Sequence, residues 1–146
     1  MMRNLIIASS ILLSTIPAVA QVQEGFCSSI NVLKQQAEGG FQDIDQGPSR
    51  PGGTSHSTGL ILPGANRCWI SVRNANPSYW CTWNVPSQVL ATQAMQFGAA
   101  IAQCIGTVPE WDRDSNSIST FLRDGSTEFY INAVNGEIDL SVETVD

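Results

Sequence analysis

The amino-acid sequence predicts a disulfide-bonded α+β domain of two layers, in which both helices cover one face of an antiparallel sheet. Three observations support this fold class. Two segments carry apolar residues at helical spacing, several others alternate apolar and polar residues between turn signals, and four cysteines are present. The expected order of elements is αβββ-αβββ, a layout of one helix and three strands used twice. Residues 21–146 are expected to form this single domain.

Residues 1–20 have the pattern of a cleaved secretory signal peptide. Arg3 precedes an apolar run over Leu5–Ile16, and the small residues that a signal peptidase requires end at Ala20. The apolar run is shorter than the about 20 helical residues that cross a membrane. The mature chain is therefore expected to be periplasmic or secreted, without a membrane span.

The composition narrows the classes of partner. The chain has 146 residues, with Lys+Arg 7 against Asp+Glu 13 and a formal net charge of -6. This acidity argues against a groove that follows a phosphate backbone, so nucleic acid is not an expected partner. No spacing in the sequence matches a strong metal or cofactor template, and no cofactor is expected.

The first half of the domain begins with a helix. Apolar residues at steps of three and four predict this helix over Gln23–Glu38, ended by Gly39-Gly40. Segment 46–59 is rich in Gly, Pro, Ser and Thr and has no apolar residue, which predicts a mobile surface loop. Leu60-Ile61-Leu62 then predicts a short strand ended by Pro63-Gly64.

A β-hairpin follows. Segments Arg67–Arg73 and Tyr79–Val85 alternate apolar and polar residues and flank Asn74–Pro77, whose residue types favour a turn. An even number of cysteines in an exported chain favours disulfides, and the absence of a Cys-x-x-Cys spacing argues against metal or redox chemistry. Pairing the two hairpin cysteines leaves one cysteine beside the apolar stripe of each helix. The predicted disulfides are therefore Cys68–Cys81 and Cys27–Cys104.

The second half repeats the layout. Ser87 is a suitable N-cap for a helix with its apolar stripe over Leu90–Ile105, and Gly106 provides its C-terminal stop. The dipeptides Asp124-Gly125 and Asn135-Gly136 are strong signals for two hairpin turns. The expected meander has strands over Ile118–Arg123, Ser126–Val134 and Glu137–Val145, with Ile138, Leu140 and Val142 facing inward.

The hairpin register also predicts a binding surface. If Cys68 lies opposite Cys81, then Trp69 lies opposite Trp80 on the other face, together with Arg67 and Arg73. Guanidinium groups stack on indole rings, and aromatic and Arg residues dominate interface hot spots. This surface is a candidate for binding protein, peptide or sugar. The alternative is that the loop, another strand or a second copy of the chain covers it.

The outer face of the meander carries the second candidate surface. Glu128, Glu137, Asp139 and Glu143 are expected to form an acidic face. Such a face either serves solubility or docks a basic partner, because complementary charge speeds encounter and rejects wrong partners.

Catalysis is the competing hypothesis. Glu110, Asp112 and Asp114 gather carboxylates in one short segment, and paired carboxylates can hydrolyse a glycosidic bond. The segment also matches the first half of a calcium loop, but Ser117 and Arg123 stand where Gly and Glu are required. Because neighbours on one loop rarely flank a substrate, a solvated acidic turn is the expected structure.

The expected function is that of a secreted or periplasmic protein-binding module without catalysis, such as an inhibitor, an immunity protein or an envelope accessory factor. The alternatives are a small envelope hydrolase using the three carboxylates and a carbohydrate-binding module using the surface tryptophans. His56 is the only imidazole and lies in the predicted loop, which is a poor platform for a catalytic base. It is expected to be an exposed loop histidine.

Overall fold

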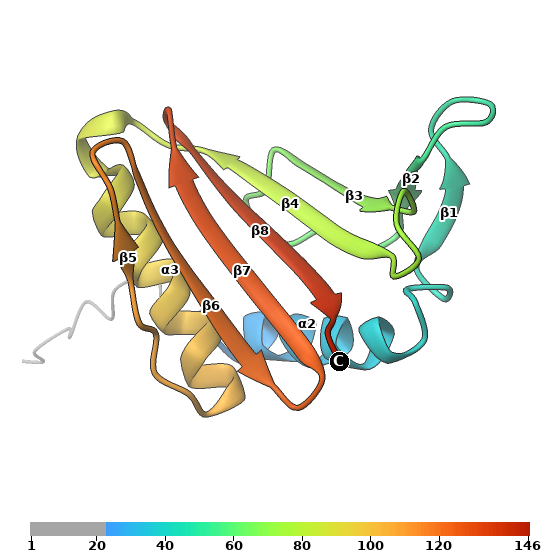
Figure 1. The fold of residues 1–146 in the computed structure, drawn as a ribbon, viewed down its shortest axis with the longest axis horizontal. Coiled ribbons are helices and arrows are strands. Elements are labelled where there is room, and N and C mark those ends of the chain that lie inside the picture. Colours follow the sequence, from blue (N-terminus) through green and yellow to red (C-terminus); the bar gives the residue numbers. More distant parts are fainter. Residues whose placement is uncertain (1–22) are drawn as a thin grey trace, which may run out of the picture.

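The computed structural model describes residues 23–146, which form helices α2 (Gln23–Glu38) and α3 (Leu90–Ile105) and one 8-stranded antiparallel sheet (Figure 1). The predicted α+β class, antiparallel sheet and disulfide bonding are confirmed. The signal peptide expected over 1–20 lies outside the described residues. The strands are β1 (Asp45–Pro48), β2 (Ser55–Thr58), β3 (Arg67–Ser71), β4 (Ser78–Asn84), β5 (Asp112–Arg113), β6 (Ser117–Asp124), β7 (Thr127–Val134) and β8 (Glu137–Thr144).

The order of elements differs from the expected αβββ-αβββ, because four strands follow each helix within residues 23–146. Segment 46–59 contains β2 and most of β1, and the residues 60–62 expected as a strand are not one. Strands β1 and β2 have no apolar alternation by which a strand could be predicted, because they lie at the sheet edge and bury few side chains. Of their residues only Thr58 is buried. Their pairing rests on backbone hydrogen bonds, which leave no apolar pattern.

The sheet is built from two meanders that meet at its centre. The strand order is β1-β2-β3-β4-β8-β7-β6-β5, so the last strand of each half pairs with the other. The β4–β8 pairing extends from Ser78 opposite Glu143 to Asn84 opposite Glu137. This central pairing fixes how side chains from the two halves align across the sheet.

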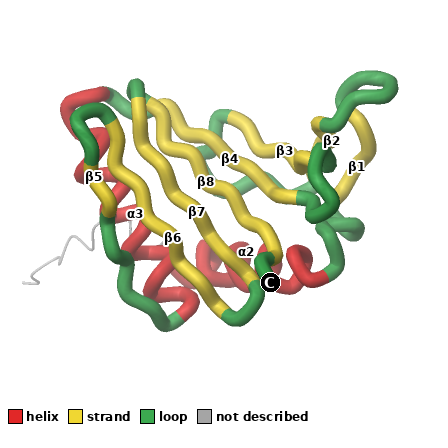
Figure 2. Tube along the Cα trace, in the orientation of Figure 1, coloured by secondary structure: helices red, strands yellow, loops and turns green. Residues whose placement is uncertain are grey.

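Both helices pack on the same face of the sheet. On that face Ile131 lies opposite Leu140, and both are fully buried. Helix α3 approaches Ile131 at Gly98, and Thr144 of β8 donates a hydrogen bond of 2.9 Å to the backbone oxygen of Ala37 in α2. Figure 2 shows both helices behind strands β6 to β8.

Two disulfides join the predicted pairs of cysteines. Cys27–Cys104 links α2 to α3, and Cys68–Cys81 links β3 to β4. The hairpin has the predicted register, with Trp69 opposite Trp80.

Details of the second half differ from the sequence prediction. Asp124 pairs with Thr127 and stays in β6, so Gly125 (φ 61) is the first central residue of the turn rather than the second. Ser87 makes no capping hydrogen bond and instead begins a short 3-10 turn before α3. Asn135 (φ 52) and Gly136 (φ 76) both adopt the left-handed conformation expected of their turn.

Replacing Gly98 by alanine is expected to lower the free energy of unfolding by about 1–3 kcal/mol. A Cβ atom at this position would lie 2.5 Å from Cζ2 of Trp111, which packs across the helix at that point. The clash outweighs the roughly 1 kcal/mol that Ala gains over Gly in a helix. Urea denaturation followed by circular dichroism measures the change.

Gly25 in α2 provides the matched control, because a Cβ atom there meets nothing within 4 Å. Gly25→Ala is expected to be neutral or stabilising. Equal stability of the Gly98→Ala protein and the unchanged protein would contradict the close packing of Trp111 on α3.

Candidate functional site

The face of the sheet opposite the helices, here called the open face, carries the candidate site. Strands β3, β4, β8, β7 and β6 lie side by side and present alternate side chains on it. No helix of the described chain lies over the part formed by β6 to β8, which is turned toward the viewer in Figures 1 and 2.

One line of paired residues crosses the open face and is here called the aromatic row: Trp69, Trp80, Ser141, Tyr130 and Phe121. The two indole rings lie 6.0 Å apart with an interplanar angle of 13°, and the Tyr130 and Phe121 rings lie 4.4 Å apart at 26°. Phe121 is 62% exposed. Four strand spacings separate the ends of the row, a span of about 19 Å.

Sequence reasoning found only half of this row. The pair Trp69 and Trp80 belongs to a local hairpin, whereas Tyr130 and Phe121 reach the row through the pairing of β8 with β4. That pairing joins segments more than fifty residues apart in the sequence and has no local signal. The alternating pattern of β6 and β7 does place Tyr130 and Phe121 on an outer face.

The predicted basic residues have separate surroundings. The guanidinium carbon of Arg67 lies 4.6 Å from the centre of the Trp69 ring, as expected. Arg73 lies beyond the end of β3, and no contact in the described chain joins it to either tryptophan. The predicted loop over 46–59 is built into the sheet edge, where β2 pairs with β3.

The acidic residues predicted on the meander lie on the same open face. Asp139 is paired with Thr82 of β4 and Asn132 of β7 on one side of the aromatic row. Glu143 and Glu128 are paired with each other on the opposite side of the row. The two surfaces predicted separately, aromatic and acidic, are therefore one continuous surface.

Asp139 has an unusual proton affinity. Burial, the charge of neighbouring Glu137 and a hydrogen bond with that side chain raise the pKa of the Asp139 carboxyl to about 6. No Lys, Arg or His of residues 23–146 forms an ion pair with either group. Glu128, by contrast, accepts a hydrogen bond of 3.0 Å from Arg123.

Replacing Asp139 by asparagine is expected to stabilise the protein at pH 7 by about 1 kcal/mol, after a reduction for solvent screening of this partly exposed group. The folded-state pKa lies above the unfolded value, so the carboxyl group becomes destabilising as pH rises from about 4 to about 6. The gain is therefore expected above pH 6 and should vanish near pH 3. Urea denaturation at both pH values measures it.

Glu38→Gln removes one exposed carboxylate at the end of α2 and serves as the control for net charge. It is expected to change stability by less than half as much at pH 7. A loss of stability at pH 7 in Asp139→Asn would contradict an unfavourable interaction between the Asp139 and Glu137 carboxylates.

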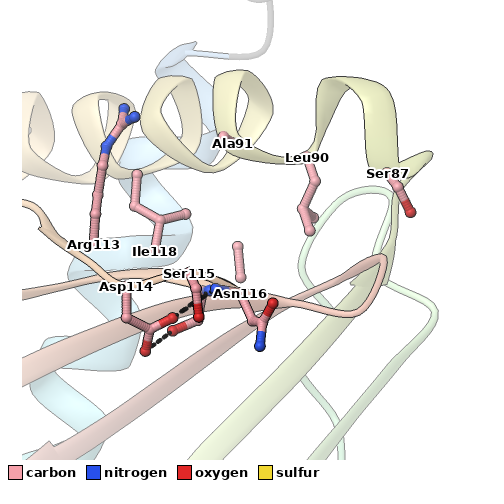
Figure 3. Close-up of a pocket in the computed structure, with 10 residues that line it drawn as sticks. Ser87, Leu90, Ala91, Arg113, Asp114, Ser115, Asn116 and Ile118 are labelled. Atoms are coloured by element: carbon pink, nitrogen blue, oxygen red, sulfur yellow. Dashed lines mark hydrogen bonds between the residues drawn. The ribbon is translucent and has the colours of Figure 1, made fainter.

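Of the three carboxylates proposed for hydrolysis, only Asp114 lines the hollow of about 230 Å³ between the β5–β6 turn and the start of α3 (Figure 3). Asp114 accepts hydrogen bonds from the backbone nitrogens of Asn116 and Ser117, both at 2.8 Å, and from the Ser117 hydroxyl at 2.9 Å. These bonds hold the pKa of Asp114 below its usual value and make it a turn-forming residue.

The other two carboxylates are placed differently. Asp112 pairs with Ser119 and so faces the open side of the sheet, while the backbone oxygen of Glu110 accepts a bond of 2.7 Å from Thr120. Figure 3 shows Arg113 reaching toward α3 while the Asp114 carboxylate turns the other way. Nothing in this arrangement directs two carboxylates at one substrate.

His56 does not have the exposed loop position that was expected. It lies on β2, partly buried, and its Nδ1 is 2.7 Å from Oδ2 of Asp45 on β1. This pair could not be predicted from the sequence, because the polar segment that contains His56 has no apolar alternation to indicate a strand. No serine of the described chain is hydrogen-bonded to the imidazole, so the pair holds the sheet edge together without forming a triad.

Within residues 23–146, no group of three or more His, Cys, Asp or Glu side chains is arranged to hold a metal ion. Neither described helix combines the length and the apolar character needed to cross a membrane. Two disulfides are typical of a protein that folds in an oxidising compartment.

Comparison of the chain with protein-family models, with curated proteins and with solved structures gives no match in any of the three. The class of protein therefore follows from its fold and site. It is a disulfide-bonded α+β protein with an aromatic and acidic open sheet face.

Proposed function

We propose that this chain is a secreted or periplasmic binding protein without catalytic activity, which contacts a protein partner through its open face. The aromatic row is the observation that carries the proposal. Large aromatic side chains and arginine provide much of the energy in protein interfaces when they are desolvated at the centre of a contact. Here two pairs of aromatic rings lie on one line across the sheet, on either side of Ser141.

The size of the open face supports a macromolecular partner. The row spans about 19 Å across the strands, and an eight-residue strand such as β8 extends about 27 Å in the other direction. A flat rectangle of these two lengths has an area of about 500 Å², without the added area of protruding side chains. Each partner in a standard protein interface buries roughly 800 Å². A single sugar ring would cover only a small part of this surface.

The ring contacts favour a protein over a glycan. Phe121 and Tyr130 stack on each other, and the Arg67 guanidinium lies over Trp69. Ring faces that a sugar would stack on are thus already partly occupied. The mixture of aromatic, arginine and carboxylate groups fits a protein interface, in which aromatic anchors stand beside polar and charged groups.

The proposed compartment rests on two features. The signal-peptide pattern of residues 1–20 directs export, and the disulfides are stable outside the reducing cytosol. An inhibitor, an immunity protein or an envelope accessory factor is the kind of binding protein that we propose for this compartment.

Affinity capture followed by reconstitution tests the proposal. The immobilised full chain is exposed to envelope and culture fractions, captured proteins are identified and purified, and their binding is measured against the unchanged protein and a Trp69→Ala/Trp80→Ala variant. Circular dichroism establishes that both are folded. We expect a purified protein to bind the unchanged chain at least tenfold more tightly than it binds the Trp69→Ala/Trp80→Ala variant. A glycan that quenches tryptophan fluorescence, with no purified protein bound, would contradict the proposal.

A further inference from the structure

The open face has an uneven distribution of charge. Its two guanidinium groups are already engaged, since Arg67 lies over Trp69 and Arg123 is paired with Glu128. Three carboxylates on β8 have no cation within ion-pairing distance among residues 23–146. These are Glu137, Asp139 and Glu143.

The geometry of β8 arranges these carboxylates in a line. Glu137, Asp139, Ser141 and Glu143 alternate along the strand on the open face, so successive side chains are about 6.8 Å apart. Ser141 is the point at which the aromatic row crosses the line, between Trp80 and Tyr130. Along β8 the surface therefore offers two carboxylates, an aromatic crossing and a third carboxylate.

The pair at one end of this line is unfavourable in the isolated protein. Glu137 and Asp139 repel each other as like charges when both are ionised, and Asp139 is partly buried, which raises the cost of its charge. An ammonium or guanidinium group from outside would replace repulsion by attraction, and charge-assisted hydrogen bonds are stronger than neutral ones. Neighbouring rings of the aromatic row favour cations as well, because their π faces are negative.

Building on the proposed function, we propose that the partner is a protein that presents an extended segment with Lys or Arg at alternate positions, and that this segment lies along β8. An extended chain repeats its side chains on one face every 6.8 Å or so, which is the spacing of the carboxylates. Cationic side chains then meet Glu137 and Asp139 at one end and Glu143 at the other. The sign of the charge opposes nucleic acid and anionic lipid as occupants.

This proposal predicts dependence on pH and salt. Asp139 faces Glu137 on its own strand and Tyr130 diagonally across on β7, while its neighbours on β4, Thr82 and Asn84, do not titrate. Protonation of Asp139 as pH falls below about 6 removes one of the recognised charges, so binding should weaken. Added salt should weaken it further, because exposed charges are screened.

Two synthetic probes test the inference directly. A labelled ten-residue peptide of alternating Arg and Ser, and its counterpart of alternating Glu and Ser, are titrated with the full chain, and fluorescence anisotropy reports binding. We expect the Arg peptide to bind at pH 7.5, to bind about tenfold more weakly to Glu137→Gln/Asp139→Asn, and to weaken at pH 5. The Glu peptide is expected not to bind.

A matched variant controls for net charge. Glu38→Gln/Asp43→Asn also removes one Glu and one Asp, both exposed and away from the open face, and is expected to change affinity less than about twofold. The inference would be overturned if both double variants lost affinity for the Arg peptide equally. It would also be overturned if the Arg peptide did not bind the unchanged chain at millimolar concentration.

Measurements with the purified native partner separate this inference from the proposed function. If Trp69→Ala/Trp80→Ala abolishes partner binding while Glu137→Gln/Asp139→Asn leaves it unchanged, the proposal of a cationic segment along β8 is wrong and the proposed function stands. If neither variant weakens the partner, both proposals fail. If both variants lose affinity for the partner while Glu38→Gln/Asp43→Asn does not, the proposed function and the cationic segment are both supported.

Discussion

Replacing Trp80 by alanine is expected to weaken binding of the purified protein partner by about 30-fold to 1,000-fold. Trp80 stands inside the aromatic row, between Trp69 and Ser141, and its indole nitrogen donates a hydrogen bond of 2.7 Å to Ser78. Truncating a central aromatic anchor costs about 2–4 kcal/mol of binding free energy, and about 1.4 kcal/mol corresponds to a factor of ten. Isothermal titration calorimetry measures the loss.

Two further variants make this prediction specific. Trp80→Phe keeps an aromatic ring in the row and should retain more affinity than Trp80→Ala. Val108→Ala truncates an apolar side chain that is 81% exposed and outside the strands of the open face, and it is expected to have little effect. An equal loss of affinity in Val108→Ala and Trp80→Ala would contradict a contact centred on the aromatic row.

Removing the disulfide between the helices, by Cys27→Ser/Cys104→Ser, is expected to lower the free energy of unfolding by about 4 kcal/mol. The bond closes a loop between residues 77 apart in sequence, and a longer loop restricts the unfolded chain more. It also ties α2 to α3 on one side of the sheet. Urea denaturation of the unchanged and variant proteins, under conditions that preserve the other disulfide, measures the difference.

The second disulfide gives the comparison. Cys68 and Cys81 are separated by 13 residues, so Cys68→Ser/Cys81→Ser is expected to cost about 3 kcal/mol, less than the helix variant. Because this bond lies beside the Trp69 and Trp80 pair, its removal should also weaken partner binding. A larger loss of stability from the hairpin variant than from the helix variant would contradict the loop-closure argument.

Local features of the sequence were sufficient to predict the hairpins. The Asn135-Gly136 turn needs two residues with positive φ, and Asn and Gly supply them at low cost. In the hairpin around Asn74–Pro77, placing Cys68 opposite Cys81 defined the register that brings Trp69 opposite Trp80. In each case the decisive interaction joins residues close together in the chain.

Pairings between distant segments could not be predicted. The contact of β4 with β8 aligns Trp80 with Ser141 and Tyr130, and so completes the aromatic row. No residue pattern selects this pairing over another order of the same strands. For the same reason, the acidic face and the tryptophan surface were expected separately, although β8 carries both the acids and the crossing point of the row.

The polar edge of the sheet was missed for a different reason. Strands β1 and β2 lack the apolar alternation by which strands are recognised, and the contact between Asp45 and His56 depends on their pairing. A histidine in a segment rich in Gly and Ser then resembles a loop residue. Its carboxylate partner becomes identifiable only once the two strands lie side by side.

Site-specific photocrosslinking shows whether the open face docks a protein partner. Benzoylphenylalanine in place of Phe121 puts a photoreactive group on the open face, and in place of Val108 it puts the same group on an exposed position elsewhere. The full chains are irradiated in native cells, and adducts are identified by mass spectrometry. We expect a protein adduct at position 121, formed with a partner segment rich in Lys or Arg, and none at position 108. Protein adducts at 108 alone, or a glycan adduct at 121, would contradict docking of a protein on the open face.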